Sequence, residues 1–200
     1  MDLIEACESN DTEKAMGLIM NNDINLGTVD IHKRTALIWA CLNAMKEVAL
    51  ELIKTGKSNP DHINKEERTA LIWACVHGME EVALELIKTG HSNPEHVDNY
   101  GYTALIWACQ TARKKVALEL IKTGKSNPDN IDNCGKTALM LAYKYCMEEV
   151  AFELIKIGKS NPDHIIKDEK TYISWAREKE IKKLALKITK SWKHSFFGGK

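Results

Sequence analysis

The sequence predicts an all-α protein, built as a solenoid of helix–turn–helix units that are joined by short β-hairpin-like loops. Three recurring blocks lead to this prediction. The segment TALIWAC begins at Thr35, Thr69 and Thr103, so its copies are 34 residues apart. The segment VALELIKTG recurs in the same register in three units and as VAFELIKIG in the fourth, and the tripeptide S-N-P recurs in all four. Three blocks that keep one period over four copies indicate an array of about six repeats, counting a degenerate repeat at each end.

The period divides the 200 residues into a central array and two ends. Residues 1–34 are expected to form an N-terminal capping repeat, and residues 171–200 a C-terminal capping repeat with a basic tail. An open stack of repeats leaves an apolar face at each end, which more polar terminal repeats must cover. Four full repeats lie between these ends, at residues 35–68, 69–102, 103–136 and 137–170.

Each unit is expected to open with a short apolar helix that follows a threonine. In the first full repeat, the Thr35 hydroxyl is expected to cap the helix by accepting an unpaired backbone N–H. One helix face then carries Leu37, Ala40, Cys41 and Ala44 at the spacing i, i+3, i+4, i+7. Ile38 and Trp39 widen this apolar face until it almost surrounds the helix, which predicts burial between neighbouring repeats.

A second helix and a loop complete the unit. The apolar stripe of this helix consists of Met45, Val48, Ala49, Leu52 and Ile53. Gly56 follows it, where a left-handed C-cap residue is expected. The segment Ser58-Asn59-Pro60-Asp61 cannot continue a helix and has the composition of a turn. Helices of roughly 8–10 residues do not persist alone in water, so packing against the next repeat must hold them.

These blocks resemble the ankyrin repeat. T-A-L-I-W-A-C matches the ankyrin opening T-P-L-H-x-A in register, and Gly78-Met79 and V-A-L-E-L-I-K-T-G follow it as they do in that family. The sequence departs from the family in its period, 34 residues rather than about 33. Alanine replaces the motif proline, and isoleucine or methionine replaces the motif histidine. The near-identical copies are similar to arrays carried by large DNA viruses of amoebae and by some protists.

Composition and motifs exclude several classes of function. Lys plus Arg and Asp plus Glu number 28 each, so no global charge attracts nucleic acid or a membrane. No apolar run approaches the ~18 residues of a membrane span, and the acidic N-terminus has no secretory signal. A cytosolic location is therefore expected, in the host cell if the origin is viral. No catalytic or nucleotide-binding motif occurs, so we expect no enzymatic activity, cofactor or small-molecule substrate.

Cysteine and histidine positions favour structural roles over metal binding. Four cysteines share one repeat position: Cys7, Cys41, Cys75 and Cys109. Stacked helices lie roughly 8–10 Å apart, beyond the ~7 Å that a disulfide allows, so reduced core thiols are expected. Cys134 and Cys146 lie off this register, in a hairpin and at a helix end, and an exposed, reactive thiol at either position is the less favoured interpretation. His62, His96 and His164 share a loop position, where bonds to an adjacent loop are expected rather than metal.

Two further patterns have both a structural and a functional interpretation. Trp39, Trp73 and Trp107 form a ladder that Leu141 interrupts and Trp175 resumes. Packing between first helices is the favoured interpretation, over a row of binding anchors. The second helices begin with Glu80-Glu81, Lys114-Lys115 and Glu148-Glu149 in alternation. Mutual neutralisation of neighbouring repeats by modest surface ion pairs is favoured over recognition of a partner.

Differences among the copies predict where a partner binds. The copies diverge at the hairpin tips and at the ends of the first helices, and the ankyrin resemblance implies that these regions line a concave surface. The predicted contact residues are Lys65, Glu66, Glu67, His77, Asn99, Tyr100, Tyr102, Gln110, Thr111, Asn133, Lys136, Lys144 and Tyr145. Tyr100 and Tyr102 are the best anchors, because tyrosine is rigid and amphipathic. The expected function is a monomeric, non-catalytic scaffold that binds another protein.

Two alternatives remain open. Ile181, Leu184, Ala185 and Ile188 form one stripe of a lysine-rich C-terminal helix, next to the aromatic tail SWKHSFFGGK. Such a segment could attach the array to an anionic membrane or to nucleic acid. The array could also be purely structural, without a partner.

Overall fold

A computed structural model describes residues 2–21 and 25–157, which belong to one compact unit. The predicted C-terminal cap and basic tail therefore lie outside the described residues, as do residues 158–170 of the last full repeat. The first helices of the successive repeats are α1 (Leu3–Glu8), α3 (Ala36–Leu42), α5 (Ala70–Val76), α7 (Ala104–Gln110) and α9 (Ala138–Lys144). The second helices are α2 (Thr12–Ile19), α4 (Lys46–Lys54), α6 (Glu80–Lys88), α8 (Lys114–Lys122) and α10 (Glu148–Lys156).

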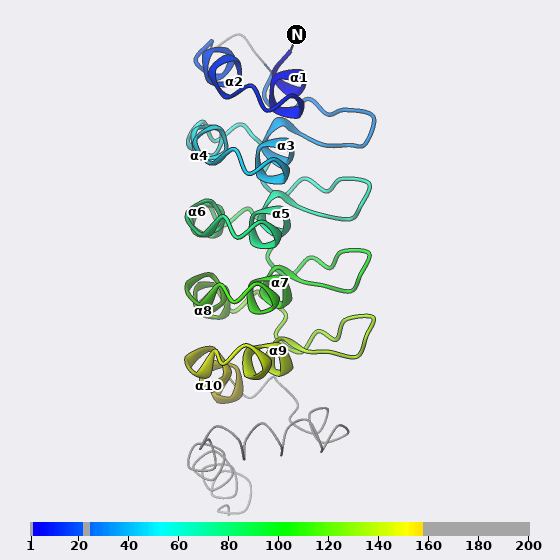
Figure 1. Ribbon diagram of the computed structural model, residues 1–200, viewed down its shortest axis with the longest axis vertical. Helices are drawn as coiled ribbons and strands as arrows, with labels where there is room; N and C mark the ends of the chain where they lie inside the picture. Colours follow the sequence, from blue (N-terminus) through cyan, green and yellow to red (C-terminus); the bar gives the residue numbers. More distant parts are fainter. Residues whose placement is uncertain (1, 22–24, 158–200) are drawn as a thin grey trace, which may run out of the picture. The chain divides into compact units, whose positions relative to one another are not determined.

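The helices stack in two columns (Figure 1). Each first helix packs on the second helix of its own repeat and on the first helix of the next repeat. The second helices likewise pack on one another along the array. Hairpin loops project from the first helices on the side away from the second helices (Figure 1). The described residues thus form the predicted all-α solenoid, with isolated β-bridges Val29–Thr35 and Ile131–Thr137 in two of the hairpins.

The residues that flank the helices have the capping roles that the sequence predicts. The Thr35 side chain accepts the Ile38 N–H at 3.2 Å, and the equivalent threonines cap α5, α7 and α9 in the same way. Asp2 replaces threonine at α1 and forms a capping box with Glu5. Gly56 has φ +67°, the left-handed conformation that its C-terminal position predicts.

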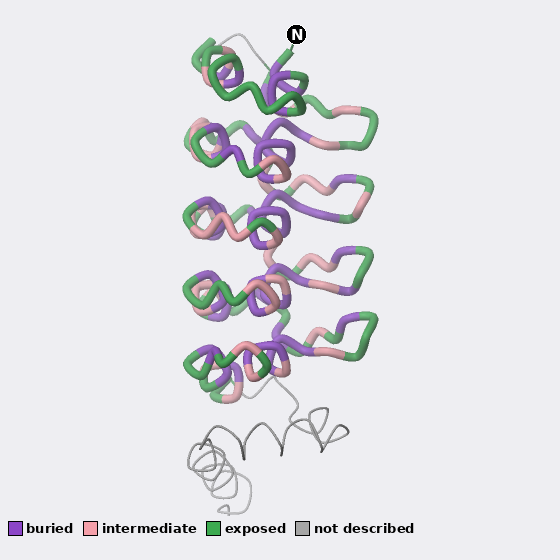
Figure 2. The backbone as a smooth tube through the Cα atoms, in the orientation of Figure 1, coloured by how far each residue is buried: buried purple, intermediate pink, exposed green. Residues whose placement is uncertain are grey.

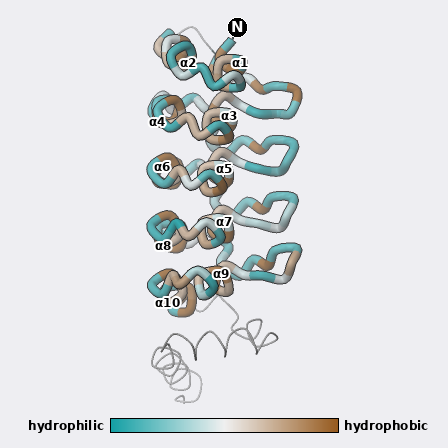
Figure 3. Tube along the Cα trace, viewed as in Figure 1, coloured by the Kyte–Doolittle hydropathy of each residue, from teal (hydrophilic) through white to brown (hydrophobic). Residues whose placement is uncertain are grey.

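The core is the layer between successive first helices, together with the inner faces of the second helices (Figure 2). Every residue from Ala36 to Cys41 is buried, which confirms the prediction that this helix is enclosed on nearly all sides. Ala44 does not belong to this core, although its spacing predicts it. The helix ends at Leu42, and Ala44 is an exposed turn residue with φ +54°. Apolar colouring in Figure 3 follows the helices, and the hairpins are mostly hydrophilic.

The cysteines occupy the predicted positions in the structure. The four thiols of the shared register, Cys7, Cys41, Cys75 and Cys109, are free and buried. Burial raises the pKa of the Cys75 thiol to about 12, so this thiol stays protonated at neutral pH. Cys134 and Cys146 are exposed, the outcome that the sequence analysis does not favour, because a hairpin tip and the turn after α9 leave both side chains at the surface.

Hydrogen bonds tie each hairpin to the next one. His62 Nε2 bonds to the Lys33 carbonyl at 2.9 Å, and His96 Nε2 bonds to the Glu67 carbonyl at 3.0 Å. Asn130, which stands at the same repeat position, donates to the Gly101 carbonyl. These bonds confirm the predicted bonding of the loop histidines to an adjacent loop. His164 lies outside the described residues.

Ion pairs link the second helices. Lys46 pairs with Glu81 of the next repeat at 2.5 Å, and Lys115 pairs with Glu80 of the preceding one at 3.1 Å. Lys114 pairs with Glu149 at 2.5 Å. The alternating charges therefore neutralise one another, as predicted. Because these side chains are solvent-exposed, each pair stabilises the fold by only about 0–1 kcal/mol.

Candidate interaction surface

We call the hairpins, together with the C-terminal ends of α3, α5, α7 and α9, the hairpin face of the repeat stack. None of the predicted contact residues is buried. The exposed ones are Lys65, Glu67, His77, Asn99, Tyr100, Asn133 and Lys144. The half-buried ones are Glu66, Tyr102, Gln110, Thr111, Lys136 and Tyr145.

Some predicted contact residues support the scaffold through hydrogen bonds between repeats. Thr111 Oγ1 donates to the Cys75 carbonyl at 3.1 Å. Gln110 Nε2 donates to the Tyr145 hydroxyl at 2.8 Å. Asn133 Nδ2 donates to the carbonyl of Asn99, 34 residues earlier, at 3.1 Å. These side chains hold neighbouring repeats in register, and a partner would meet them already ordered.

A buried carboxylate organises the hairpin at α7. Asp98 Oδ1 accepts the backbone N–H groups of Tyr100 and Tyr102, both at 3.0 Å. Its Oδ2 accepts the Trp107 indole N–H at 3.0 Å and the Arg68 Nε–H at 3.1 Å. Four donors from three successive repeats therefore satisfy one carboxylate, which fixes the shape of the hairpin and its junctions with the neighbouring repeats.

Arg68 lies among aromatic rings at this junction. Its guanidinium carbon is 4.5 Å from the ring centre of Trp73, 5.2 Å from that of Trp107 and 5.4 Å from that of Tyr100. The residue is only 9% exposed, although it stands at the end of a hairpin tip. Cation–π contacts on several sides and the ion pair with Asp98 compensate for the loss of hydration.

The preceding junction uses the same frame with different residues. Arg34 lies 4.7 Å from the Trp39 ring centre and pairs with Glu66, because Asn64 stands where the next hairpin has Asp98. The Asn64 amide nitrogen donates to Glu66 and cannot accept a hydrogen bond. The Trp73 indole N–H is therefore buried without an acceptor among the described residues, whereas the equivalent Trp107 N–H binds Asp98.

The following junction lacks the tryptophan and the arginine that donate to Asp98. Asp132 Oδ1 accepts the backbone N–H groups of Cys134 at 2.8 Å and Lys136 at 2.7 Å. Its Oδ2 is buried without a well-aligned donor among the described residues, because Leu141 replaces the tryptophan and Tyr102 replaces the arginine. The Tyr102 hydroxyl lies near this carboxylate: burial first, and then the charge and hydrogen-bonding capacity of Asp132, raise the pKa of that hydroxyl. The three junctions thus share a backbone frame but differ in charge.

Comparison with protein families identifies this architecture. A family model described as ankyrin repeats, in three copies, matches residues 3–95 and 83–168. The chain belongs to the ankyrin-repeat family. Ankyrin repeats generally mediate protein–protein interactions, and the family is typically non-catalytic. A comparison with curated proteins gave no match.

His77 occupies the ankyrin hairpin face beside the arginine. Its ring stacks on Trp73 with centroids 5.7 Å apart and planes at 12°. Partial burial and the positive charge of Arg68 lower the pKa of His77 below its usual value. Arg68 and Asp98, which organise this surface, are not among the contact residues that the sequence predicts. One signal in the sequence points to them: an aspartate stands nine residues before a tryptophan at two repeat boundaries, and the pair is hydrogen-bonded at both.

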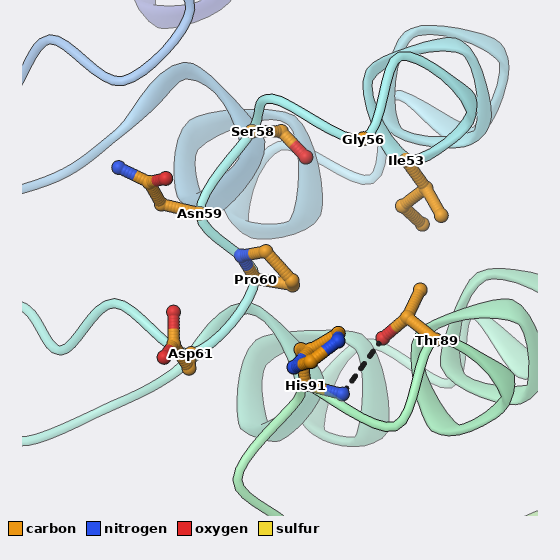
Figure 4. Close-up of a pocket in the computed structure, with 8 residues that line it drawn as sticks. All are labelled: Ile53, Gly56, Ser58, Asn59, Pro60, Asp61, Thr89 and His91. Carbon is orange, nitrogen blue, oxygen red and sulfur yellow. Dashed lines mark hydrogen bonds between the residues drawn. The ribbon is translucent and has the colours of Figure 1, made fainter.

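The remaining features of the described ankyrin repeats indicate no other class of site. A pocket of about 210 Å³ lies between the loops that follow α4 and α6 (Figure 4). It is smaller than the ~300–1,000 Å³ typical of ligand sites. Within residues 2–21 and 25–157, no three His, Cys, Asp or Glu side chains are grouped to hold a metal ion. None of the helices in this part of the chain has the length and apolarity needed to cross a bilayer.

Proposed function

We propose that this protein is a non-catalytic ankyrin scaffold that binds a partner protein through a concave groove on its hairpin face. One observation carries the proposal. Most buried residues of the repeats are nearly identical, apart from those at the hairpin junctions, whereas the predicted contact residues, which differ between repeats, are all exposed or half-buried on this face. Exposed residues that differ between repeats with a shared core support a role in recognition, because the core does not require these differences.

The side chains of the hairpin face suit protein recognition. Tyr100 is 60% exposed and presents a rigid ring at a hairpin tip. Tyrosine, tryptophan and arginine, the residue types most enriched in binding hot spots, lie together at this junction. Bonds between successive hairpins, such as that from the Asn133 backbone N–H to the Tyr100 carbonyl at 3.2 Å, order the surface before binding. Less conformational entropy is therefore lost on association.

The proposal includes a monomeric protein in the cytosol with no cofactor and no small-molecule substrate. Attachment of the array through the basic C-terminal segment concerns residues 181–200, which lie outside the described residues. That alternative has no support from the described surface, where the lysines of the second helices are paired with glutamates.

A pull-down from eukaryotic cell lysate tests the proposal. The hairpin-face variant Tyr100→Ala/Lys136→Glu is compared with Phe152→Ala/Lys125→Glu, which makes the same kinds of change at exposed sites on a second helix and in a loop. We expect one partner to bind the wild type and the second variant and to be lost from the first. Equal retention by both variants would contradict binding through the hairpin face.

A further inference from the structure

The guanidinium of Arg68 is only partly used within the described residues. Its Nε is bonded to Asp98, and no other hydrogen bond of the side chain is found there. Its terminal nitrogens are not among the buried atoms that lack a partner, so they reach solvent. The two terminal nitrogens, which carry four N–H groups, therefore have some contact with solvent at a side chain that is otherwise nine-tenths buried.

The neighbouring junction shows what such donors bind. A terminal nitrogen of Arg34 donates to a carboxylate oxygen of Glu66, in the same position relative to the aromatic ring and the hairpin. Glu66 is 34 residues before Tyr100, so the two residues occupy equivalent places in successive hairpins. Tyr100 covers the guanidinium of Arg68 with its ring but offers these N–H groups no acceptor within the described residues.

We propose that Arg68 binds a carboxylate side chain of the partner, an aspartate or glutamate, at the place that Glu66 fills beside Arg34. This inference rests on the proposed function and names the chemistry that the hairpin face recognises. The carboxylate accepts two N–H groups of the guanidinium in the bidentate geometry that arginine favours. The partner's acid would thus complete an interaction that the protein already makes once internally.

Asp98 does not serve as the acceptor for the terminal nitrogens of Arg68. Its two oxygens accept four donors, of which Arg68 supplies only Nε–H. Burial, and then the positive charge of Arg68, lower the pKa of His77, so the charge of Arg68 still acts on the hairpin face. Both observations favour an anion at the terminal nitrogens.

The side chain is also held ready for binding. Trp73, Trp107 and Tyr100 surround the guanidinium at 4.5–5.4 Å, and the ion pair fixes its Nε edge. An arginine that is already ordered loses little rotamer entropy when it binds, in contrast to an exposed lysine such as Lys65. Binding by Arg68 is therefore expected to exceed that of the surrounding surface charges.

A random dodecapeptide library, selected on the wild-type protein, tests the inference. We expect the selected peptides to share one aspartate or glutamate. Replacing that residue with glutamine or asparagine should weaken binding at least about tenfold, because charge-assisted hydrogen bonds are lost. Isothermal titration calorimetry gives the dissociation constants. Selected peptides without a shared acid, or no enrichment of any peptide, would overturn the inference.

Two variants of the protein locate the acid. Tyr100→Glu places an internal carboxylate where Glu66 stands in the preceding hairpin, whereas Tyr100→Gln has the same size without charge. The glutamate variant should bind the acidic peptide at least about tenfold more weakly than the glutamine variant. Both changes lie at an exposed tip, so the fold is retained, as circular dichroism can verify.

The outcomes separate this inference from the proposed function. Peptides that need the hairpin face but bind both variants equally would refute the role of Arg68 and leave the scaffold function standing. Peptides whose binding is unchanged by Tyr100→Ala/Lys136→Glu would contradict both.

Discussion

The carboxylate of Asp98 is the most informative residue to perturb. Asp98→Asn keeps the shape of the side chain and removes its charge. The amide oxygen can still accept the backbone N–H groups of Tyr100 and Tyr102. The amide NH₂ then faces two donors, the Trp107 indole and the Arg68 Nε–H, which lose their acceptor.

The expected cost follows from these contacts. Removing one partner of a buried ion pair typically costs about 3–5 kcal/mol, and an unpaired indole N–H adds about 1 kcal/mol. Because the terminal nitrogens of Arg68 keep contact with solvent, we expect a total cost at the lower end of the range that these two values give. We expect Asp98→Asn to lower the free energy of unfolding by about 4 kcal/mol. At roughly 2–4 °C per kcal/mol, Tm should fall by about 8–16 °C.

The natural Asn64 hairpin suggests a rescue. There, Glu66 supplies the charge that the asparagine lacks. Tyr100→Glu places a carboxylate at the equivalent position and should recover about 1–2 kcal/mol in the Asp98→Asn background. A double-mutant cycle measures this coupling, because the two residues share Arg68 as a partner.

Urea unfolding, followed by circular dichroism at pH 7, measures these changes. Asp61→Asn, the same change at an exposed loop aspartate, serves as the control and should stay within about 0.5 kcal/mol of wild type. If Asp98→Asn costs less than about 1 kcal/mol, or if Tyr100→Glu recovers nothing, the carboxylate does not organise the junction as we argue.

Three other predictions concern single positions. Ala112→Gly should raise the free energy of unfolding by about 0.5–1 kcal/mol in urea titrations, because Ala112 has φ +56° where Gly78 stands in the preceding repeat. A loss of stability would contradict this. Since the folded pKa of His77 is lowered, its contribution is present above the unfolded pKa of about 6.5 and is lost as pH falls. His77→Asn should therefore lose less stability than wild type between pH 7.5 and pH 5; an equal loss would refute the assignment. A thiol reagent at pH 8 should modify Cys134 and Cys146 in the native protein, and all 6 cysteines only in denaturant.

The candidate surface was only partly predictable. The contact residues were chosen because they differ between repeats, and the structure leaves none of them buried. Arg68 is only 9% exposed, although it closes a repeat beside the exposed tip residues Lys65 and Glu67. Its acceptor, Asp98, comes from the next hairpin, 30 residues later, and its aromatic neighbours come from the two repeats that follow it. Residue types at one position do not reveal such contacts.

The sequence by itself determined the features that depend on neighbouring residues or on the period. Thr35 caps a residue only three positions away, and Cys41 is buried because its register places it between stacked helices in each copy. Ala44 fits the apolar spacing yet lies outside the helix, because periodicity does not specify where a helix ends. Only the tertiary structure decided which hydrogen-bond donors and acceptors meet across a junction. The reason is physical: the 34-residue period fixes which backbones are adjacent, whereas the charge at each junction depends on single substitutions that face one another across repeats.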